Sequence, residues 1–456
     1  MGQMNGRLSA EDLMLVLGPV PTGGIRAWLY EGLRERIRGE SLTAGTSLPS
    51  SRQVAAALGV ARGTVTGALD LLVDEGFLVS RPRSGLVVAA VGGRAQAVPA
   101  PARVAPASPG TPDPALFPHT GWTRALRQAM RDLGPRHLGY QDPQGLPELR
   151  EVVADHLRRT RGVVARAQDV IVVNGVAQAQ SLLASVLSAG GNSTVAVEDP
   201  GSPGTRALLG AVGMEVLPVP VDGDGLMVEA IPARAGAVVV TPAHQFPTGC
   251  VLSSERRREL VERSAGSRLI IEDDYDAELR FDRRPVPALQ ALAPDSVALV
   301  GSVSKTLAPS FRLGWLVAPK HMLPSLISAK RYADLGTGVV DQLALAHFLG
   351  SGAYQRHVRS VRSVYQRRRR ELLTALAFQL PELRVLGVEA GLHVVIELPD
   401  PGAEAAAVDA LTAAGMACHG YSDTFDGVGR PGVVLGTART GVEAIGVLRE
   451  VLHPKN

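Results

Sequence analysis

The residue in this sequence best suited to covalent chemistry is Lys305, in the stretch 301–315 (GSVSKTLAPSFRLGW). Of the 47 Lys plus Arg side chains, only four are lysines, at positions 305, 320, 330 and 455. Arginine keeps its proton and cannot form an imine, whereas a lysine amine can attack a carbonyl. The chain uses arginine wherever a positive charge suffices, so we expect Lys305 to be present for its amine.

Hydroxyl groups and an arginine surround Lys305 in the sequence. Ser302 and Ser304 precede it and Arg312 follows it, after an apolar run at 297–300 that predicts a buried strand. These groups in one loop suit a phosphorylated aldehyde, because the amine can form a Schiff base while the other groups hold the phosphate. The alternative is an ordinary lysine in a Gly/Ser-rich turn.

A second phosphate-binding feature is predicted after the apolar run 169–173. There Gly175, Val176 and Ala177 open a long apolar helix. Free backbone N–H groups at a helix N-terminus form a site for phosphate. The signal is weak by itself, because any strand–glycine–helix turn looks similar.

A third feature is a cluster of acidic residues. The run 269–271 predicts another buried strand, and it ends in Glu272, Asp273 and Asp274. A carboxylate beside a pyridine nitrogen keeps that nitrogen protonated, which makes a pyridine cofactor an electron sink. The alternatives are a solvated strand end or a metal site. Because no histidine accompanies the acids, we expect no metal.

Length and composition limit the class of protein. A chain of 456 residues that is 45% hydrophobic suggests two or three domains, and its net charge of +3 does not by itself indicate a nucleic-acid partner. Cys250 and Cys418 lack the spacing of a disulfide framework or a metal site. No signal peptide and no apolar run of membrane-spanning length is evident. We therefore expect a cytoplasmic protein without a membrane anchor.

The first part of the chain predicts a DNA-binding fold. Residues 1–20 are interpreted as a loose arm. Apolar spacing and glycine breaks then predict three helices followed by two short strands, at residues 24–38, 50–58, 62–74, 77–80 and 86–89. Three helices with a tight turn between the second and third, followed by a hairpin, describe a winged helix-turn-helix.

The stretch 48–85 (LPSSRQVAAALGVARGTVTGALDLLVDEGFLVSRPRSG) closely resembles the GntR-type DNA-binding domain. Its recognition helix would open with Arg62 and Thr64 at base edges in the major groove, and its wing would bring arginines to phosphates. By this resemblance the expected DNA contacts are Arg52, Arg62, Thr64, Arg81, Arg83, Ser84 and Gly85. The alternative is solvated surface charge, because residues 1–92 carry nine Arg against eight acidic residues.

The rest of the chain predicts a linker and an α/β domain. Residues 90–118 are dominated by Ala, Pro and Gly, which indicates a semi-extended spacer. Beyond them, short apolar runs alternate with helical patterns, which predicts a mainly parallel sheet. We therefore expect a winged helix-turn-helix domain at 1–89, a linker at 90–118 and an α/β domain at 119–456.

The loop around Lys305 and the acidic strand end are similar to those of the fold-type I aminotransferases, which bind pyridoxal 5'-phosphate. That resemblance implies that Lys305 forms the Schiff base, Asp273 contacts the pyridine nitrogen and Tyr275 the ring hydroxyl. It also implies a set of phosphate-binding residues, namely Arg312, Ser302, Ser304, Gly175, Val176 and Ala177. Tyr140, in HLGYQDPQGLPELR, matches a tyrosine that reaches the phosphate of the neighbouring subunit, which implies a dimer.

Together the two halves resemble the MocR family, in which a GntR-type winged helix is fused to an aminotransferase-like domain. The resemblance extends over almost everything from Arg26 onward. It implies a homodimer, often arranged head to tail, whose winged helices bind spaced half-sites of an operator in double-stranded DNA. The vitamin-B6 regulators of this family, of the PdxR type, sense pyridoxal phosphate itself. Other members sense an amino compound, such as GABA or taurine, through the bound cofactor.

Two departures from that family bear on function. Ser202 stands where relatives usually carry an aromatic residue that stacks on the cofactor ring, a contact worth about 0.5–1.5 kcal/mol beyond burial. The strand at 433–435 lacks the arginine that binds a substrate carboxylate in aminotransferases, and Arg430 and Arg439 only flank it. Without that anchor the affinity for an amino acid and its orientation both fall, which weighs against transamination.

Three other features of the second half of the chain are an arginine run, a histidine on an apolar strand and a phenylalanine in the turn TPAHQFPTG. The arginines at 356–370 indicate a solvated or dimer-contacting helix, or else a second, sequence-independent contact with DNA. His393, on an apolar strand, is expected to be a core or interface residue rather than a catalyst. Phe246 occupies the place where many aminotransferases have an asparagine bonded to the cofactor.

Three functions remain open. The favoured one is a transcription regulator whose effector is pyridoxal phosphate, because the amino-acid anchor is poor. The second is a regulator that senses an amino compound and holds the cofactor permanently. The third is a working aminotransferase, which requires a carboxylate-binding arginine that the sequence does not locate. In either regulator a ligand shifts DNA binding only through its differential affinity for the two states.

Overall fold

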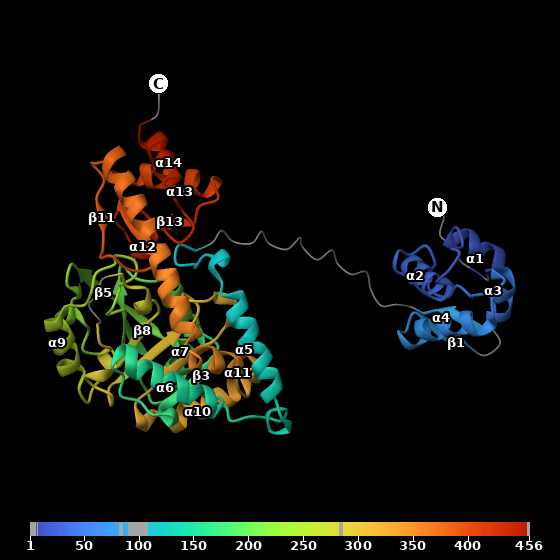
Figure 1. Ribbon diagram of the computed structural model, residues 1–456, viewed down its shortest axis with the longest axis horizontal. Coiled ribbons are helices and arrows are strands. Elements are labelled where there is room, and N and C mark those ends of the chain that lie inside the picture. The colour runs from blue at the N-terminus through green and yellow to red at the C-terminus, as the bar shows by residue number, and fades with distance from the viewer. Residues whose placement is uncertain (1–5, 7, 82–84, 90–107, 282–285, 454–456) are drawn as a thin grey trace. The chain divides into compact units, whose positions relative to one another are not determined.

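The computed structural model describes residues 6, 8–81, 85–89, 108–281 and 286–453 (Figure 1). The chain divides into two compact units, Met1–Val104 and Ala105–Asn456. Of the stretch predicted as a linker, residues 90–107 lie outside the described residues, and residues 108–118 belong to the larger unit. None of the described helices is long and apolar enough to cross a membrane.

The first unit is a winged helix-turn-helix. Its elements are α1 (Ala10–Leu17), α2 (Ile25–Arg38), α3 (Ser51–Leu58), α4 (Arg62–Asp74), β1 (Leu78–Arg81) and β2 (Gly85–Val88). The two strands pair antiparallel, with Leu78 opposite Val88. Apolar residues at helical spacing on α2 and α4, including Leu29, Leu33 and Leu69, form its buried core.

The prediction of a loose arm at residues 1–20 is wrong, because α1 is a folded helix. Ser9 and Asp12 form a capping box, in which the Ser9 Oγ accepts from the Asp12 backbone N–H at 3.1 Å. Leu13, Val16 and Leu17 are buried in the core of the unit. A helix this short is marginal in isolation, so its burial against α2 and α3 decides its structure.

The second unit is built on an eight-stranded sheet with the strand order β3-β10-β9-β8-β7-β4-β5-β6. The strands are β3 (Val170–Val173), β4 (Thr194–Asp199), β5 (Glu215–Asp222), β6 (Gly225–Leu226), β7 (Ala237–Val240), β8 (Leu269–Asp274), β9 (Val297–Ser302) and β10 (Gly314–Val317). The strands from β9 to β5 run parallel to one another, as predicted, whereas β10 is antiparallel to both of its neighbours.

Helices cover both faces of this sheet. They are α5 (His119–Asp132), α6 (Pro147–Arg161), α7 (Val176–Ala189), α8 (Pro203–Ala211), α9 (Ser254–Ser264), α10 (Leu323–Asp334) and α11 (Val339–Gly350). Alternate strand residues point to opposite faces. Leu299 therefore packs with α5, α6 and α11, while Val300 packs with α7, α8 and α10. The sheet is buried on both sides, which explains its continuous apolar strands.

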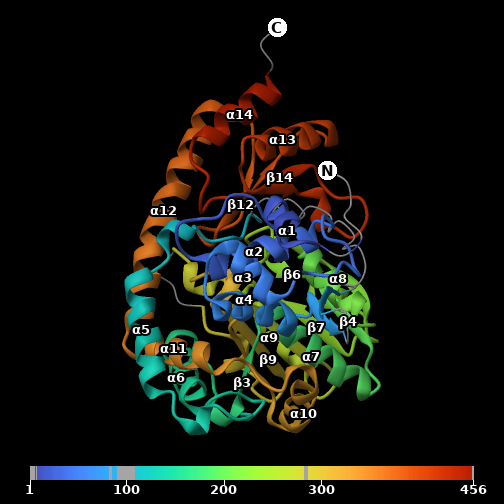
Figure 2. The same ribbon diagram turned by 90° about the vertical axis from the view of Figure 1, so that its right-hand side faces the viewer.

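A smaller antiparallel sheet follows, with the order β11-β12-β14-β13. The remaining elements are α12 (Ala353–Gln379), β11 (Val385–Leu386), β12 (His393–Glu397), α13 (Pro401–Ala413), β13 (Cys418–Gly420), β14 (Gly432–Gly436) and α14 (Glu443–Leu452). The long helix α12 connects the layer that contains α11 to this smaller sheet and to α14 (Figures 1 and 2).

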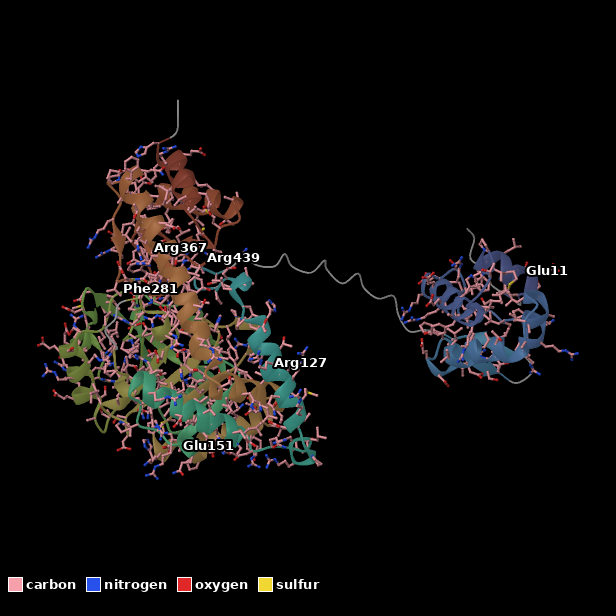
Figure 3. The ribbon with its side chains drawn as sticks, in the orientation of Figure 1. Glu11, Arg127, Glu151, Phe281, Arg367 and Arg439 are labelled. Atoms are coloured by element: carbon pink, nitrogen blue, oxygen red, sulfur yellow. The ribbon has the colours of Figure 1, made fainter. Side chains whose placement is uncertain are left out.

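The arginine run at 356–370 lies on α12 and is only partly exposed. Arg367, labelled in Figure 3, is exposed. Arg369 is buried and donates to the His393 carbonyl at 2.8 Å, and burial lowers its pKa to about 10. Arg368 forms an ion pair with Asp113 at 2.9 Å. Part of the run therefore holds the unit together rather than presenting charge to solvent.

Candidate functional site

A cavity of ≈ 410 Å³ lies at the carboxyl ends of the parallel strands of the second unit. In open α/β sheets this edge is where ligands bind. Lys305 follows β9, Asp273 is the last residue but one of β8, and Val176 begins the helix after β3. Most of the predicted cofactor residues line the cavity, namely Lys305, Asp273, Tyr275, Arg312, Ser302, Ser304, Val176 and Ala177.

Two predicted cofactor residues do not line this cavity. Gly175 directly precedes the lining residue Val176, and the Arg312 guanidinium approaches it closely. Tyr140 lies between α5 and α6 with 91% of its surface exposed, so it does not reach the cavity of its own chain. Its predicted role toward a neighbouring subunit stays a prediction.

The Lys305 side chain reaches into the cavity and bonds a neighbouring segment. Its Nζ donates to the Gly110 carbonyl at 2.8 Å. Burial lowers the pKa of the Lys305 amine, although Asp276 and Asp273 act in the opposite direction. A lowered pKa favours the neutral amine, which is the form that attacks an aldehyde.

The Asp273 carboxyl lacks the partners that a buried carboxylate normally has. Its Oδ2 accepts only a long bond of 3.4 Å from the Gln180 amide, and its Oδ1 has no partner in the described part of the chain. Burial raises its pKa to about 7, with a further contribution from Asp274. A buried polar atom without a partner indicates a group that the chain itself does not supply. A protonated pyridine nitrogen fits this requirement.

The N-terminus of α7 and Arg312 form an anion-binding cradle. Gly175, the residue before the helix, has a φ of +82° and supplies no side-chain cap for the first N–H groups. The Arg312 guanidinium donates to the Asn174 carbonyl at 2.7 Å. A Cβ at position 175 would lie 2.8 Å from the Arg312 Nη2, so only glycine lets the guanidinium approach. Free N–H groups beside a guanidinium suit a phosphate.

The hydroxyl of Tyr275 belongs to a cluster that the sequence did not reveal. It lies 3.1 Å from Nδ1 of His244, and that atom is 2.8 Å from the Asp276 carboxylate. Burial raises the pKa of Tyr275 well above its ordinary value, so the phenol keeps its proton and can donate it. His244 lies in the turn TPAHQFPTG, but nothing in its local sequence links it to a tyrosine 31 residues later.

The wall of the cavity also contains His393, Phe246 and Glu198. His393 is buried and lies 3.0 Å from the Pro247 carbonyl, and its ring centroid is 4.9 Å from that of Phe246. Burial lowers the pKa of His393 well below its ordinary value, so the imidazole is neutral. Burial also raises the pKa of Glu198 to about 7. This wall is thus short of positive charge.

The predicted DNA-binding residues lie on one unit, and most of them are exposed. Arg52 on α3, Arg62 at the start of α4 and Arg81 at the end of β1 are exposed, and Thr64 is half-buried. Arg62 donates to the Ser51 hydroxyl at 3.1 Å. The remaining wing residues are Gly85, which begins β2, and Arg83 and Ser84, which lie outside the described residues.

Comparisons with known proteins match both units. Residues 26–88 match the model of bacterial regulatory proteins of the gntR family, and residues 113–431 match the model of aminotransferase class I and II. The chain is 34% identical over 436 residues to the HTH-type pyridoxine biosynthesis transcriptional regulator PdxR of Corynebacterium glutamicum, covering 93% of this chain and 94% of that protein. The chain belongs to the MocR-type family of transcription regulators.

Other relatives of this MocR-type chain agree with the assignment. It is 34% identical to the probable rhizopine catabolism regulatory protein MocR of Rhizobium meliloti, over 84% of this chain and 83% of that protein. Among solved structures, an archaeal alanine:glyoxylate aminotransferase matches with a TM-score of 0.69 and 25% identity, covering 76% of this chain and 88% of that one. The second unit therefore has the fold-type I aminotransferase fold.

The two departures from the MocR family lie at the cavity or near it. Ser202 lines the cavity and caps α8, its Oγ accepting from the Thr205 N–H at 3.2 Å. The strand β14 presents buried Val434 where the sequence lacks a carboxylate-binding arginine. Arg430 and Arg439, which flank that strand, are both exposed and do not line the cavity.

Arg206 is a cation at the cavity that the sequence analysis missed. Its guanidinium donates to the Thr424 carbonyl at 2.6 Å and to the Phe425 carbonyl at 3.1 Å. Both bonds hold α8 against the loop between β13 and β14, so this guanidinium is already engaged by the chain. Among the described lining residues, Lys305 and Arg312 are the other lysine and arginine.

Proposed function

We propose that this transcription regulator responds to pyridoxal 5'-phosphate itself and controls a step of vitamin B6 metabolism in the cytoplasm. The observation that carries this proposal is the cavity, whose described lining residues include groups suited to the aldehyde, the ring and the phosphate of the cofactor but leave no free cation for a carboxylate. The printed name of the Corynebacterium glutamicum relative, a pyridoxine biosynthesis regulator, agrees with it.

The residues proposed to hold the cofactor divide by the part they bind. When bound, pyridoxal phosphate supplies an aldehyde that bonds an amine and a ring that accepts electrons. Lys305 is the amine, Asp273 holds the ring nitrogen, and Tyr275 donates to the ring hydroxyl. The phosphate is held by the cradle, which consists of Arg312, Ser302, Ser304, Gly175, Val176 and Ala177. Tyr140 of a second copy completes the site in a homodimer.

The lack of a carboxylate anchor separates this proposal from amino-acid sensing. If the phosphate engages Arg312 and the aldehyde engages Lys305, the remaining lining arginine is Arg206, which already donates to backbone carbonyls. The lining near Phe246 offers the neutral ring of His393, and Val434 of β14 lies in the cluster packed against Phe246 without lining the cavity. An amino-acid carboxylate there would lose its hydration without gaining a charged partner, which is unfavourable.

Gly110 contacts the cavity lysine and lies, in sequence, at the end of the larger unit that connects to the DNA-binding unit. In sequence, Gly110 closely follows residues 90–107, which join the two units. Its carbonyl accepts the bond from the Lys305 amine, and a Cβ at 110 would lie 2.7 Å from that amine. Any change in the bonding of Lys305 therefore alters its contact with Gly110. We propose that the dimer's winged helices bind spaced half-sites and that this contact couples them to the cofactor.

The second candidate is a regulator that senses an amino compound through a permanently held cofactor. The cavity favours it in one respect, because its lining includes Phe246, His393 and Glu198, which the proposed cofactor contacts do not use. A second ligand could occupy that region. Because the described lining residues leave no free cation for a carboxylate, we expect such a ligand to be an amine without a carboxylate.

The test is a DNA-binding titration against the chain's own upstream region, with and without pyridoxal phosphate, and then with added amines and amino acids. A shift in affinity or footprint with the cofactor alone supports the proposal. A shift that requires an amine in addition to the cofactor supports the second candidate. Transfer of amino groups without any DNA binding would replace both with an aminotransferase.

A further inference from the structure

A second lysine, Lys330 on α10, is completely buried. Its Nζ donates to the two Asp334 oxygens at 3.0 and 2.8 Å, to the Gln178 Oε1 at 3.2 Å and to the Thr337 hydroxyl at 3.2 Å. A buried ammonium is unfavourable unless it is paired and fully hydrogen-bonded. Lysine is rare in this chain, so we expect a completely buried lysine to have a role besides packing.

The Lys330–Asp334 pair is bonded to the turn between β3 and α7. Asp334 Oδ2 accepts from the Asn174 side chain at 2.9 Å and from the Gln178 side chain at 2.7 Å. Gln178 in turn accepts, at its Oε1, the backbone N–H of Asn174 at 2.8 Å. The backbone and the side chain of Asn174 are therefore both held by groups that the buried pair orients.

The same turn forms one side of the anion-binding cradle. The Asn174 carbonyl accepts the Arg312 guanidinium at 2.7 Å, and the next residue is Gly175, against which that guanidinium packs. The first N–H groups of α7 follow directly. A rotation of Asn174 would therefore move both the guanidinium and the helix terminus relative to a bound phosphate.

We infer that Lys330 and Asp334 are positioning residues that set the geometry of the cradle and so make the cavity selective for a phosphorylated ligand. This inference rests on the proposed function, because it takes the ligand of the cradle to be the phosphate of pyridoxal phosphate. Neither residue lines the cavity. They act through Gln178 and Asn174, and their effect is confined to the phosphate end of the ligand.

The test compares pyridoxal phosphate with pyridoxal, which lacks the phosphate, in equilibrium titrations of the full chain. Asp334→Asn keeps the shape of the side chain but replaces the oxygen that accepts from the Asn174 and Gln178 side chains with an NH2 group, which cannot accept their hydrogen bonds. Loss of such bonds should weaken pyridoxal phosphate binding by about tenfold. Binding of pyridoxal should remain within about twofold of the wild type, since its contacts lie at Lys305, Asp273 and Tyr275. Lys330→Met should act in the same direction.

Glu404→Gln is the matched control for loss of a buried carboxylate. Glu404 is buried and accepts the Gly432 N–H at 2.6 Å and the Ser422 N–H at 3.2 Å, and it does not line the cavity. Its change should lower stability without altering the preference for the phosphorylated aldehyde. The preference is the ratio of the two affinities, which a uniform loss of folded protein does not change.

Each outcome separates the inference from the proposed function. A lower preference in Asp334→Asn and Lys330→Met, with an unchanged preference in Glu404→Gln, supports the inference. Equal losses of affinity for both aldehydes, or no loss of affinity for either, would overturn the inference without contradicting the proposal that pyridoxal phosphate is the cofactor. If the wild type bound neither aldehyde, the proposed cofactor and this inference would both fall.

Discussion

The buried carboxyl of Asp273 makes a prediction about the pH dependence of the ligand-free protein. Its pKa in the folded chain is raised by burial from 3.8 to about 7. A carboxyl with a raised folded pKa stabilises the fold below its unfolded pKa, and that stability is lost as the pH rises through the folded pKa. Asp273→Asn removes the titration and nearly preserves the shape. The variant should therefore gain stability relative to the wild type as the pH rises.

The size of the effect follows from linkage. A shift from 3.8 to about 7 corresponds to roughly 4 kcal/mol when fully expressed. The Asp273 side chain is half-buried and faces the cavity, so solvent screens part of this free energy. We expect the free energy of unfolding of the wild type, relative to Asp273→Asn, to fall by roughly 2 kcal/mol between about pH 5 and about pH 8.

The assay is urea denaturation of both proteins without cofactor across that pH range. Glu272, whose pKa burial also raises to about 7, titrates in both proteins and cancels in the difference. Glu198 has a pKa raised to about 7 as well, but its charge contributes to the raised pKa of Asp273, so this coupling belongs to the measured difference. Asp222→Asn is the control, because a hydrogen bond from Arg256 lowers the pKa of Asp222, so its contribution changes only at more acidic pH. If the difference in free energy of unfolding between wild type and Asp273→Asn did not change with pH, the assignment of a protonated Asp273 would be refuted. If the wild type instead gained stability relative to the variant as the pH rises, the burial of Asp273 would be refuted.

Three further substitutions test separate parts of the molecule. Lys305→Ala should abolish the visible absorbance of the lysine–cofactor linkage, and its persistence in a spectrum would exclude Lys305 as the amine. Arg62→Ala should weaken operator binding in an electrophoretic mobility assay by about 1–3 kcal/mol if it contacts a base, with that absorbance unchanged; loss of both signals would indicate misfolding instead. Ser202→Ala should lower the free energy of unfolding by about 1 kcal/mol through loss of the α8 cap, measured with urea, and an unchanged value would show that the cap bond does not contribute.

The sequence alone was sufficient where the signal is local. The order of three helices and a hairpin in the first unit and the apolar strands of the large sheet follow from periodicity, because a buried face must repeat with the geometry of its element. The same holds for Lys305 and for Asp273, since a residue that ends a parallel strand lies at the binding edge of the sheet wherever the strand is placed. Chemistry at strand ends can therefore be predicted before the strand order is known.

The sequence was not sufficient where structure depends on distant partners. The α1 helix was predicted as a loose arm, because its eight residues are too few to fold without the core that buries Leu13 and Leu17. The contact of Gly110 with Lys305 spans 195 residues, and that of Asn174 with Asp334 spans 160. No local pattern records such pairs.

The sequence therefore determined which groups are available to the site, and the tertiary structure decided what each group does. Arg206 and Arg312 have the same chemistry in the sequence, yet one is held by carbonyls of the loop between β13 and β14 and the other donates to the Asn174 carbonyl beside the N-terminus of α7. Lys305 and Lys330 are both rare lysines, yet one faces the cavity and the other is enclosed. The physical reason is that the charge, the pKa and the bonding of a side chain depend on the groups around it, and only the folded chain brings those groups together.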